Sequence, residues 1–429
     1  MVKITQNIEA AYEPESAYAT APGSNLYHLG LLDTFDPRAV ERSITPVPSL
    51  GQSTDAFHAK GPLGVTVPIK VACNGNGWKQ LLGKAIGGTE ILSDKRANNL
   101  TTSVESLAVI AKETGGDYTL VTGVVPNEVT LEADYTTGGY ITVDAQCTGF
   151  YTLDEGDANF DGFHGDDYSG VTWPAASTVD PLLPTDLSVT VGFAAATNKL
   201  TVDGPANSSI EVGEQYMRIF DNPTGGLDAS IHSDGIIDLT ASANTQDTTE
   251  GVKDLIHGDA NWTCTRGGSD VASQNLLKGI YSTEASQEIF ATTTMAAIPN
   301  LKTVSLKIAN NNVPISGKAT GDDSSTKWLL NNAISRGKAD VTLDLTMTAE
   351  NEDFYDKYVA GTTIPLIRLD FGTHGSIALT NGTITSFSRP LSAGGEIVDT
   401  LSIKFRGAGN YKNFSAYAIS SSISLNPSG

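Results

Sequence analysis

Residues 65–71, VTVPIKV, alternate apolar and polar side chains, and residues 341–347, VTLDLTM, alternate in the same phase. A period of two places the apolar side chains on one face and is typical of a half-buried strand. Each stretch leads into a segment whose apolar residues recur at helical spacing, at 78–86 after the first and at 351–359 after the second. The sequence therefore predicts the same strand–helix unit twice.

The similarity between the two copies continues beyond this unit. Glycine ends each predicted helix, Gly87 in the first copy and Gly361 in the second. Strands are predicted near 26–31, 104–112, 117–124 and 128–134 in the first copy, and near 301–308, 363–371, 375–380 and 383–389 in the second. A Gly-Gly pair then precedes one more alternating run in each copy, which is a hairpin signal. We therefore predict two quasi-repeated halves, residues 26–150 and 300–410, with chance similarity between β-rich segments as the alternative.

The remaining segments are predicted from their composition. Residues 151–299 interrupt the repeat, carry short alternating runs, and predict an inserted β-rich domain on the outer surface. Residues 1–25 are expected to form an N-terminal arm, and residues 411–429 a C-terminal tail that could add a strand to another subunit. Residues 43–62 are rich in Gly, Pro and Ser and predict a long loop, on which Phe57 and His58 are candidate contacts to a neighbouring subunit.

The charge of the chain limits the classes of partner. The 429 residues carry 49 acidic and 27 basic side chains, a net charge of −22, with 39% hydrophobic residues. An acidic surface does not bind nucleic acid through its phosphates, because that binding requires Lys and Arg. The acidity is also explained by solubility or by a salty habitat. Three widely spaced cysteines predict free thiols, and residues 1–9 lack an apolar stretch, so we expect no secretion signal and no membrane partner.

The sequence does not predict an enzyme. It has no nucleophile elbow, zinc-protease, phosphate-binding or dinucleotide-binding motif, and its six histidines are scattered singly. A glycosidase-type pair of carboxylates remains open, although no pair is selected by its spacing. Trp78, Tyr355 and Tyr358 occupy helix faces and are expected to be core residues.

One segment predicts a metal site. Asp157, Asn159 and Asp161 precede Gly162 in the pattern that begins a calcium-binding loop, and Asp166 can add a further carboxylate. The twelfth position, where a bidentate Glu is expected, is Tyr168. The functional interpretation is a structural calcium ion, and the alternative is a solvated acidic turn.

The order of strand, long loop, strand, short helix and strand meander resembles that of the tail tube (major tail) proteins of long-tailed, siphovirus-like double-stranded DNA viruses of bacteria or archaea. The resemblance covers residues 24–150 and 300–410. It is carried by SLGQSTD at 49–55 within the segment 33–88, and by IANNNV at 308–313, which looks like a strand ending in an Asn-rich turn.

This resemblance implies a mainly β, tail-tube-type β-sandwich or barrel with short flanking helices, whose copies form rings that stack into a tube. Two halves in one chain favour a ring of three chains with pseudo-sixfold symmetry, and a hexamer is the alternative. The resemblance further implies a place in the virion tail after assembly in the host cytoplasm, and terminator, tape-measure and baseplate or hub proteins as partners. Viral DNA would pass through an acidic lumen without specific binding. Phe57, His58 and the 1–25 arm would contact the next ring.

Three other functions stay open. A tail terminator, hub or adaptor would share the fold but not the copy number. A surface or adhesin-like protein would be expected to carry a secretion signal or anchor. A carbohydrate-active enzyme would need acids and aromatic residues in one cleft.

Overall fold

Antiparallel strands make up most of the structure, which is a computed structural model, and this confirms the predicted mainly β class. It describes residues 9–15, 26–35, 40–48, 55–86, 90–91, 94–98, 106–112, 118–150, 173–175, 179–193, 197–221, 227–242, 245–293, 295–316, 331–335, 337, 339–391, 395–405 and 418–425.

The first half is a run of seven strands in the order β2–β1–β8–β9–β10–β5–β3. Its elements are β1 (Glu9–Pro14), β2 (Tyr27–His28), β3 (Leu32–Phe35), β5 (Asp55–Ala72), α1 (Gly77–Ile86), β8 (Leu107–Lys112), β9 (Tyr118–Asp134) and β10 (Thr142–Phe150). The two predicted strands 117–124 and 128–134 are one continuous strand, β9, which pairs with β8 at its start and with β10 over most of its length.

The second half repeats this order with different residues, as β19–β11–β24–β25–β26–β23–β20. Its elements are β11 (Ser188–Gly192), β19 (Ala296–Ala297), β20 (Leu301–Ala309), β23 (Asp340–Thr348), α4 (Asp353–Ala360), β24 (Ile364–Asp370), β25 (Gly375–Ser388) and β26 (Val398–Phe405). Gly361 adopts the left-handed conformation that ends α4, as predicted.

Two irregularities in the ladders fall at the same places in both halves. The β3–β5 pairing shifts between Leu32 and Thr34, and the β20–β23 pairing shifts between Leu301 and Thr303. The β9–β10 pairing shifts between Glu128 and Pro126, and the β25–β26 pairing between Ser386 and Ile384. A bulge is specific to its position in a ladder. Shared bulges therefore align the two halves residue by residue, and we call two residues at the same place in this alignment counterparts.

The insert is a separate unit with its own core. A three-stranded sheet faces a four-stranded sheet and helices cover them. The elements are β12 (Lys199–Asp203), β13 (Ser209–Val212), β14 (Tyr216–Phe220), α2 (His232–Gly235), β15 (Ile236–Asp238), α3 (Thr249–His257), β16 (Thr263–Gly267), β17 (Gly279–Ser282) and β18 (Gln287–Phe290). The predicted boundaries 151–299 are too wide, because β11 and β19 lie inside that range and pair with the second half. The insert therefore lies between β11 and β19.

Three further predictions need correction. The predicted loop 43–62 is largely a β-hairpin of β4 (Val40–Pro48) and β5, in which Phe57 pairs with Val47 and His58 with Pro46. Prolines and glycines suggested a loop, but a two-stranded ribbon has free edges that accept proline. The arm 1–25 contains β1, which pairs with β8, and the tail 411–429 contains β27 (Ala418–Leu425), which pairs with β25 of its own chain.

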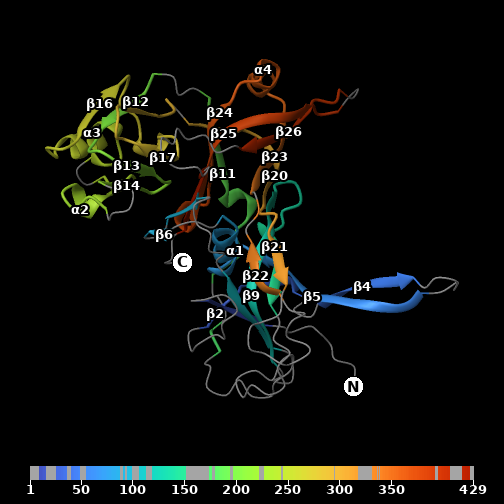
Figure 1. Cartoon of the computed structure of the whole chain (residues 1–429). Helices are drawn as coiled ribbons and strands as arrows, with labels where there is room; N and C mark the ends of the chain where they lie inside the picture. The colour runs from blue at the N-terminus through green and yellow to red at the C-terminus, as the bar shows by residue number, and fades with distance from the viewer. Residues whose placement is uncertain are drawn as a thin grey trace.

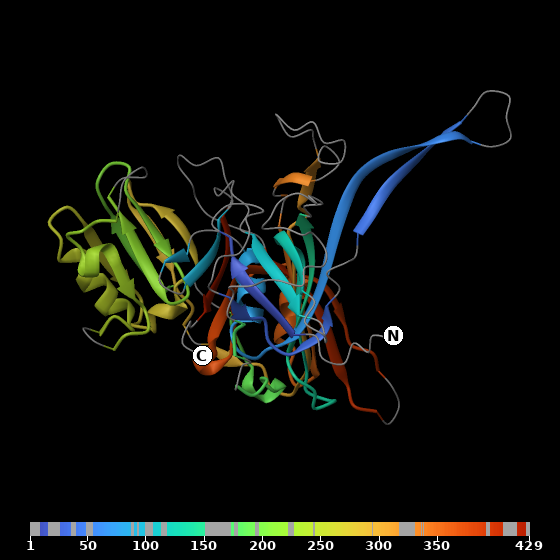
Figure 2. The ribbon, with the colours of Figure 1, turned by 90° about the horizontal axis from the view of Figure 1, so that it is seen from below.

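The hairpin and the insert lie on opposite sides of the two halves (Figures 1 and 2). The hairpin extends away from the body, and the insert lies beside β24 and β25. Smaller elements complete the chain: β6 (Glu90–Ile91), β7 (Asp94–Asn98) and the hairpin of β21 (Val313–Ser316) with β22 (Asn331–Ser335).

Candidate functional site

The two halves are joined edge to edge by β9 and β20. These strands pair antiparallel from Thr303 opposite Asp134 to Ala309 opposite Glu128. Inward side chains of both strands are buried in one shared core that spans the two halves. We call this pairing the internal joint. It makes one continuous sheet from two repeated units.

Asparagine residues form hydrogen bonds across the internal joint just after the end of β20. The buried Asn310 side chain donates from Nδ2 to the carbonyl of Ala85 at 2.6 Å, and its backbone N donates to the carbonyl of Asn127 at 2.7 Å. The backbone N of Asn312 donates to Oδ1 of Asn127 at 2.7 Å. The Asn-rich turn singled out in the sequence thus links β20 to the bulge of β9 and to the end of α1.

Replacing Asn310 with Ala is expected to lower the free energy of unfolding by about 1–3 kcal/mol, because the buried Ala85 carbonyl loses its donor. Urea denaturation measures the loss. The control is Asn261→Ala, an exposed asparagine in the insert, for which we expect a change within about 0.5 kcal/mol. Equal effects of the two substitutions would show that the turn does not fasten the joint.

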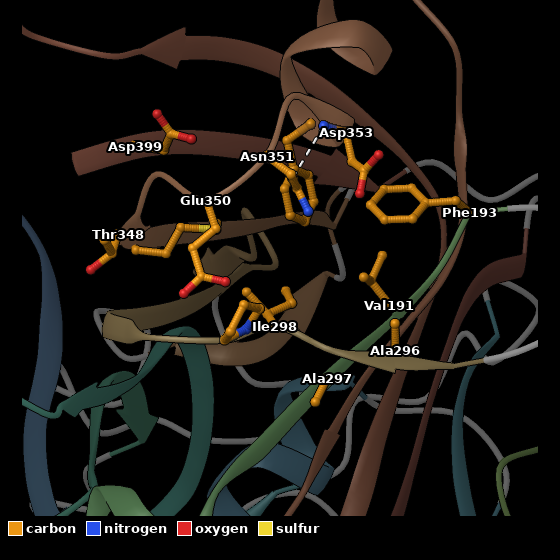
Figure 3. Close-up of a pocket in the computed structure, with 13 residues that line it drawn as sticks. Val191, Phe193, Ala296, Ala297, Ile298, Thr348, Glu350, Asn351, Asp353 and Asp399 are labelled. Atoms are coloured by element: carbon orange, nitrogen blue, oxygen red, sulfur yellow. Dashed lines mark hydrogen bonds between the residues drawn. The ribbon is translucent and has the colours of Figure 1, made fainter. Parts of the chain in front are cut away.

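A small pocket lies at the start of α4 (Figure 3). Its volume is about 70 Å³, well below the roughly 300–1,000 Å³ of usual small-molecule sites. Val191 of β11 and Phe193, which follows that strand, line it on one side, and Glu350 and Asp353 line it from the segment around the start of α4. The counterparts of Val191 and Ala296 in the first half are Tyr12 and Tyr27. The ring centroids of these two tyrosines are 5.7 Å apart. Smaller side chains therefore stand at these two positions of the second half.

One acid of this pocket is engaged by an arginine. Asp399 accepts two hydrogen bonds from Arg389, at 2.6 and 2.8 Å, which commits its carboxylate to an ion pair. Within the described ranges, no group of three His, Cys, Asp or Glu side chains is placed to hold a metal ion.

The insert is fixed to the second half by buried charges. Glu214 of the insert is fully buried, and its Oε1 accepts from Arg368 Nε on β24 at 2.5 Å and from Ser376 Oγ on β25 at 3.0 Å. Lys278 Nζ lies 3.3 Å from Oε2 of the same carboxylate. Burial alone would raise the pKa of Glu214, but Arg368 and Lys278 hold this pKa below its usual value. The carboxylate is therefore ionised between two cations at the boundary of the insert.

The predicted site residues are distributed as follows. Asp157, Asn159, Asp161 and Asp166 lie outside the described residues, so calcium binding stays a prediction. Phe57 and His58 lie on the hairpin strand β5, and contact with another ring stays a prediction. Cys73, Cys147 and Cys264 are buried free thiols whose pKa values are raised by burial. In the described part of the chain, helices are too short or too polar to cross a membrane.

Sequence reasoning was wrong about two aromatic residues. Trp78 is a core residue on α1, as expected, but Tyr355 and Tyr358 on α4 are 44% and 40% exposed. Their rings pack on Phe387 of β25, with centroids 5.6 and 6.1 Å apart. Helical spacing predicts which side chains share a face, but it does not predict whether that face is covered within the chain.

Comparisons with known proteins give limited similarity. No family model matches the chain, and no curated protein matches it. One similar solved structure is the tail of an empty gene transfer agent particle with C6 symmetry, at 15% identity and a TM-score of 0.22, covering 27% of this chain and 83% of that one. Another is the virion of a native gene transfer agent particle, at 13% identity and a TM-score of 0.22, covering 29% of this chain and 88% of that one.

Proposed function

We propose that the chain is a structural virion protein that self-assembles into stacked rings, forming the tail tube through which viral DNA passes. The internal joint is the observation that carries the proposal. One chain already contains two repeated units joined edge to edge, and repetition of such a joint closes a ring without free sheet edges. Three chains would supply six units, so a trimeric ring with pseudo-sixfold symmetry is favoured over a hexamer.

The projecting hairpin supports a role in stacking. Strands β4 and β5 extend beyond the body of the subunit, as an element that bridges to a neighbour must (Figure 2). Phe57 and His58, on this hairpin, are our candidates for contacts with the next ring. The insert lies on the opposite side and would decorate the outside of the tube.

The charge supports passive passage of DNA. A net charge of −22 opposes binding to phosphates, so a tube built of such chains would let DNA slide without adhering. The proposed role is non-enzymatic. A tail terminator, hub or adaptor on the same fold is the second candidate, because it would use the same internal joint once per tail.

Negative-stain electron microscopy of the purified chain tests the proposal. We expect hollow tubes or annular rings, with three large lobes in end-on class averages. Stacking into tubes separates the tube protein from a terminator or adaptor, which would stop at single rings. A protein that stays monomeric under varied salt and calcium would contradict the proposal.

A further inference from the structure

The two counterpart helices differ sharply in burial. On α1, eight of ten residues are buried, including Trp78, Lys79, Leu81 and Leu82. On α4, Phe354 is the buried residue and the rest of the helix is largely exposed. Both helices follow counterpart strands, β5 and β23, at the same distance in the chain. The difference therefore lies in what covers each helix.

The second half exposes apolar side chains at five positions whose counterparts in the first half are buried. Tyr355, Tyr358, Val359, Leu391 and Ile397 are 44%, 40%, 66%, 80% and 42% exposed. Their counterparts in the first half are Lys79, Leu82, Gly83, Ala133 and Ile141, and all of these are buried. Exposed apolar side chains at positions that the first half buries indicate an interaction surface. We call the five exposed residues the α4 face.

Part of the cover of α1 comes from the second half, alongside contacts with β7 and β27. The end of β20 lies against α1, where Asn310 donates to the Ala85 carbonyl. The ring of Phe371, which follows β24, packs on Trp78 with centroids 5.4 Å apart. These two contacts on α1 come from the next repeated unit along the chain. By the same arrangement, a further repeated unit would cover the α4 face.

Free strand edges accompany the α4 face. Beyond Gly382, β25 pairs with β26 along one edge. The corresponding portion of its counterpart β9 pairs with β10 along one edge and with β20 along the other. Strand β3 pairs with β5, whereas its counterpart β20 pairs with both β23 and β9. Among the described strands, β25 and β3 therefore each have one unpaired edge. The corresponding edges of their counterparts, β9 and β20, pair with each other in the internal joint. An unpaired edge is a template for another chain.

We propose that the α4 face binds the β3 edge of a second copy of this chain, in the register of the internal joint. Phe35 of the second copy would lie opposite Leu391, because their counterparts Val304 and Ala133 lie opposite each other and are buried. The contact is head to tail, so each chain offers one face and one edge and the assembly can close into a ring. The inference rests on the self-assembly in the proposed function and not on its place in a tail.

Thiol cross-linking between two variants tests the register. Phe35→Cys and Leu391→Cys are made in chains of different tag length, mixed under assembling conditions and treated with a short bismaleimide. The native cysteines are buried, which protects them. We expect a cross-linked species containing both tags. The control mixture, Leu391→Cys with Ala229→Cys on the exposed surface of the insert, is expected to give at least about tenfold less product.

A charge on the α4 face provides a second test. The double substitution Tyr358→Asp and Val359→Asp is expected to raise the apparent dissociation constant at least about tenfold in sedimentation velocity, because aspartate opposes burial at an interface centre. The circular dichroism spectrum should be unchanged, since both side chains are largely exposed in the single chain, and the lost contact of Tyr358 with Phe387 should lower the melting temperature only slightly. Ala229→Asp is the matched control and should assemble normally.

The outcomes separate the joint from the proposed function. Tubes that form without the Phe35–Leu391 cross-link would overturn this inference and leave the tube function standing. Cross-linked rings that never stack would support this inference and contradict the tube. Cross-links only between like variants, normal assembly of the double variant, or a monomer at all concentrations would each overturn the inference.

Discussion

Replacing Glu214 with Gln is expected to lower the free energy of unfolding by about 3–5 kcal/mol, because it leaves Lys278 and Arg368 without their shared counter-charge. Lys278 and the Glu214 side chain are nearly free of solvent contact, so water cannot replace the lost ion pair. Urea denaturation measures the loss. Amide exchange should locate it in β14, β17 and β24, which carry or flank the cluster.

Two comparisons separate a buried charge from an ordinary ion pair. Glu288→Gln removes the partner of Lys199 in an exposed pair, and we expect a loss below about 1 kcal/mol. The triple variant Glu214→Leu, Lys278→Met and Arg368→Met removes all three charges together, and it should recover most of the stability lost in Glu214→Gln. A Glu214→Gln variant as stable as Glu288→Gln would show that the cluster does not fix the insert.

The same cluster sets a pH dependence. The pKa of Glu214 in the folded chain is below its usual 4.5, so the ionised carboxylate stabilises the fold above pH 4.5. This contribution is lost as the pH falls below 4.5 and passes through the folded pKa, because the carboxylate then takes up a proton. The triple variant should lose less stability than the natural chain over that range.

Sequence periodicity predicted the repeat because each strand buries one face inside the chain. Within residues 66–71 and 341–347, the alternation is the burial pattern of β5 and β23, which is why both strands could be located. The boundary of the insert could not be predicted in this way. Strands β11 and β19 are short, and their assignment to the second half depends on pairing with β24, far along the sequence.

The predictions for surfaces failed where the deciding contact lies far along the sequence or outside the chain. The apolar spacing of α4 and of α1 is alike in the sequence, but α1 is buried, in part by contacts with the second half, and α4 is exposed. No local pattern distinguishes these two cases. Likewise the Asn-rich turn is visible in the sequence, but its hydrogen bonds to Ala85 and Asn127 cannot be predicted from it. They depend on the pairing of two segments that are far apart in the chain.

Replacing Trp78 with Ala is expected to lower the free energy of unfolding by about 3–5 kcal/mol, through lost burial and the cavity that remains. Trp78 is among the largest fully buried side chains and lies on α1 between the two halves, against Phe371. Urea denaturation measures the loss. Tyr140→Ala, at an aromatic residue that is 57% exposed, should change stability by no more than about 0.5 kcal/mol.

The Trp78 variant also shows whether the internal joint couples the halves energetically. Because Phe371 directly follows β24, loss of the Trp78 ring should raise amide exchange in β24 as well as in α1. Faster exchange in α1 alone would mean that each half is stable by itself and that the joint only places them side by side. Coupled exchange would instead mean that a repeated unit needs cover from the next one to reach full stability. The α4 face would then be the less stable end of the chain until a second copy binds, and assembly should slow amide exchange in α4 and β25.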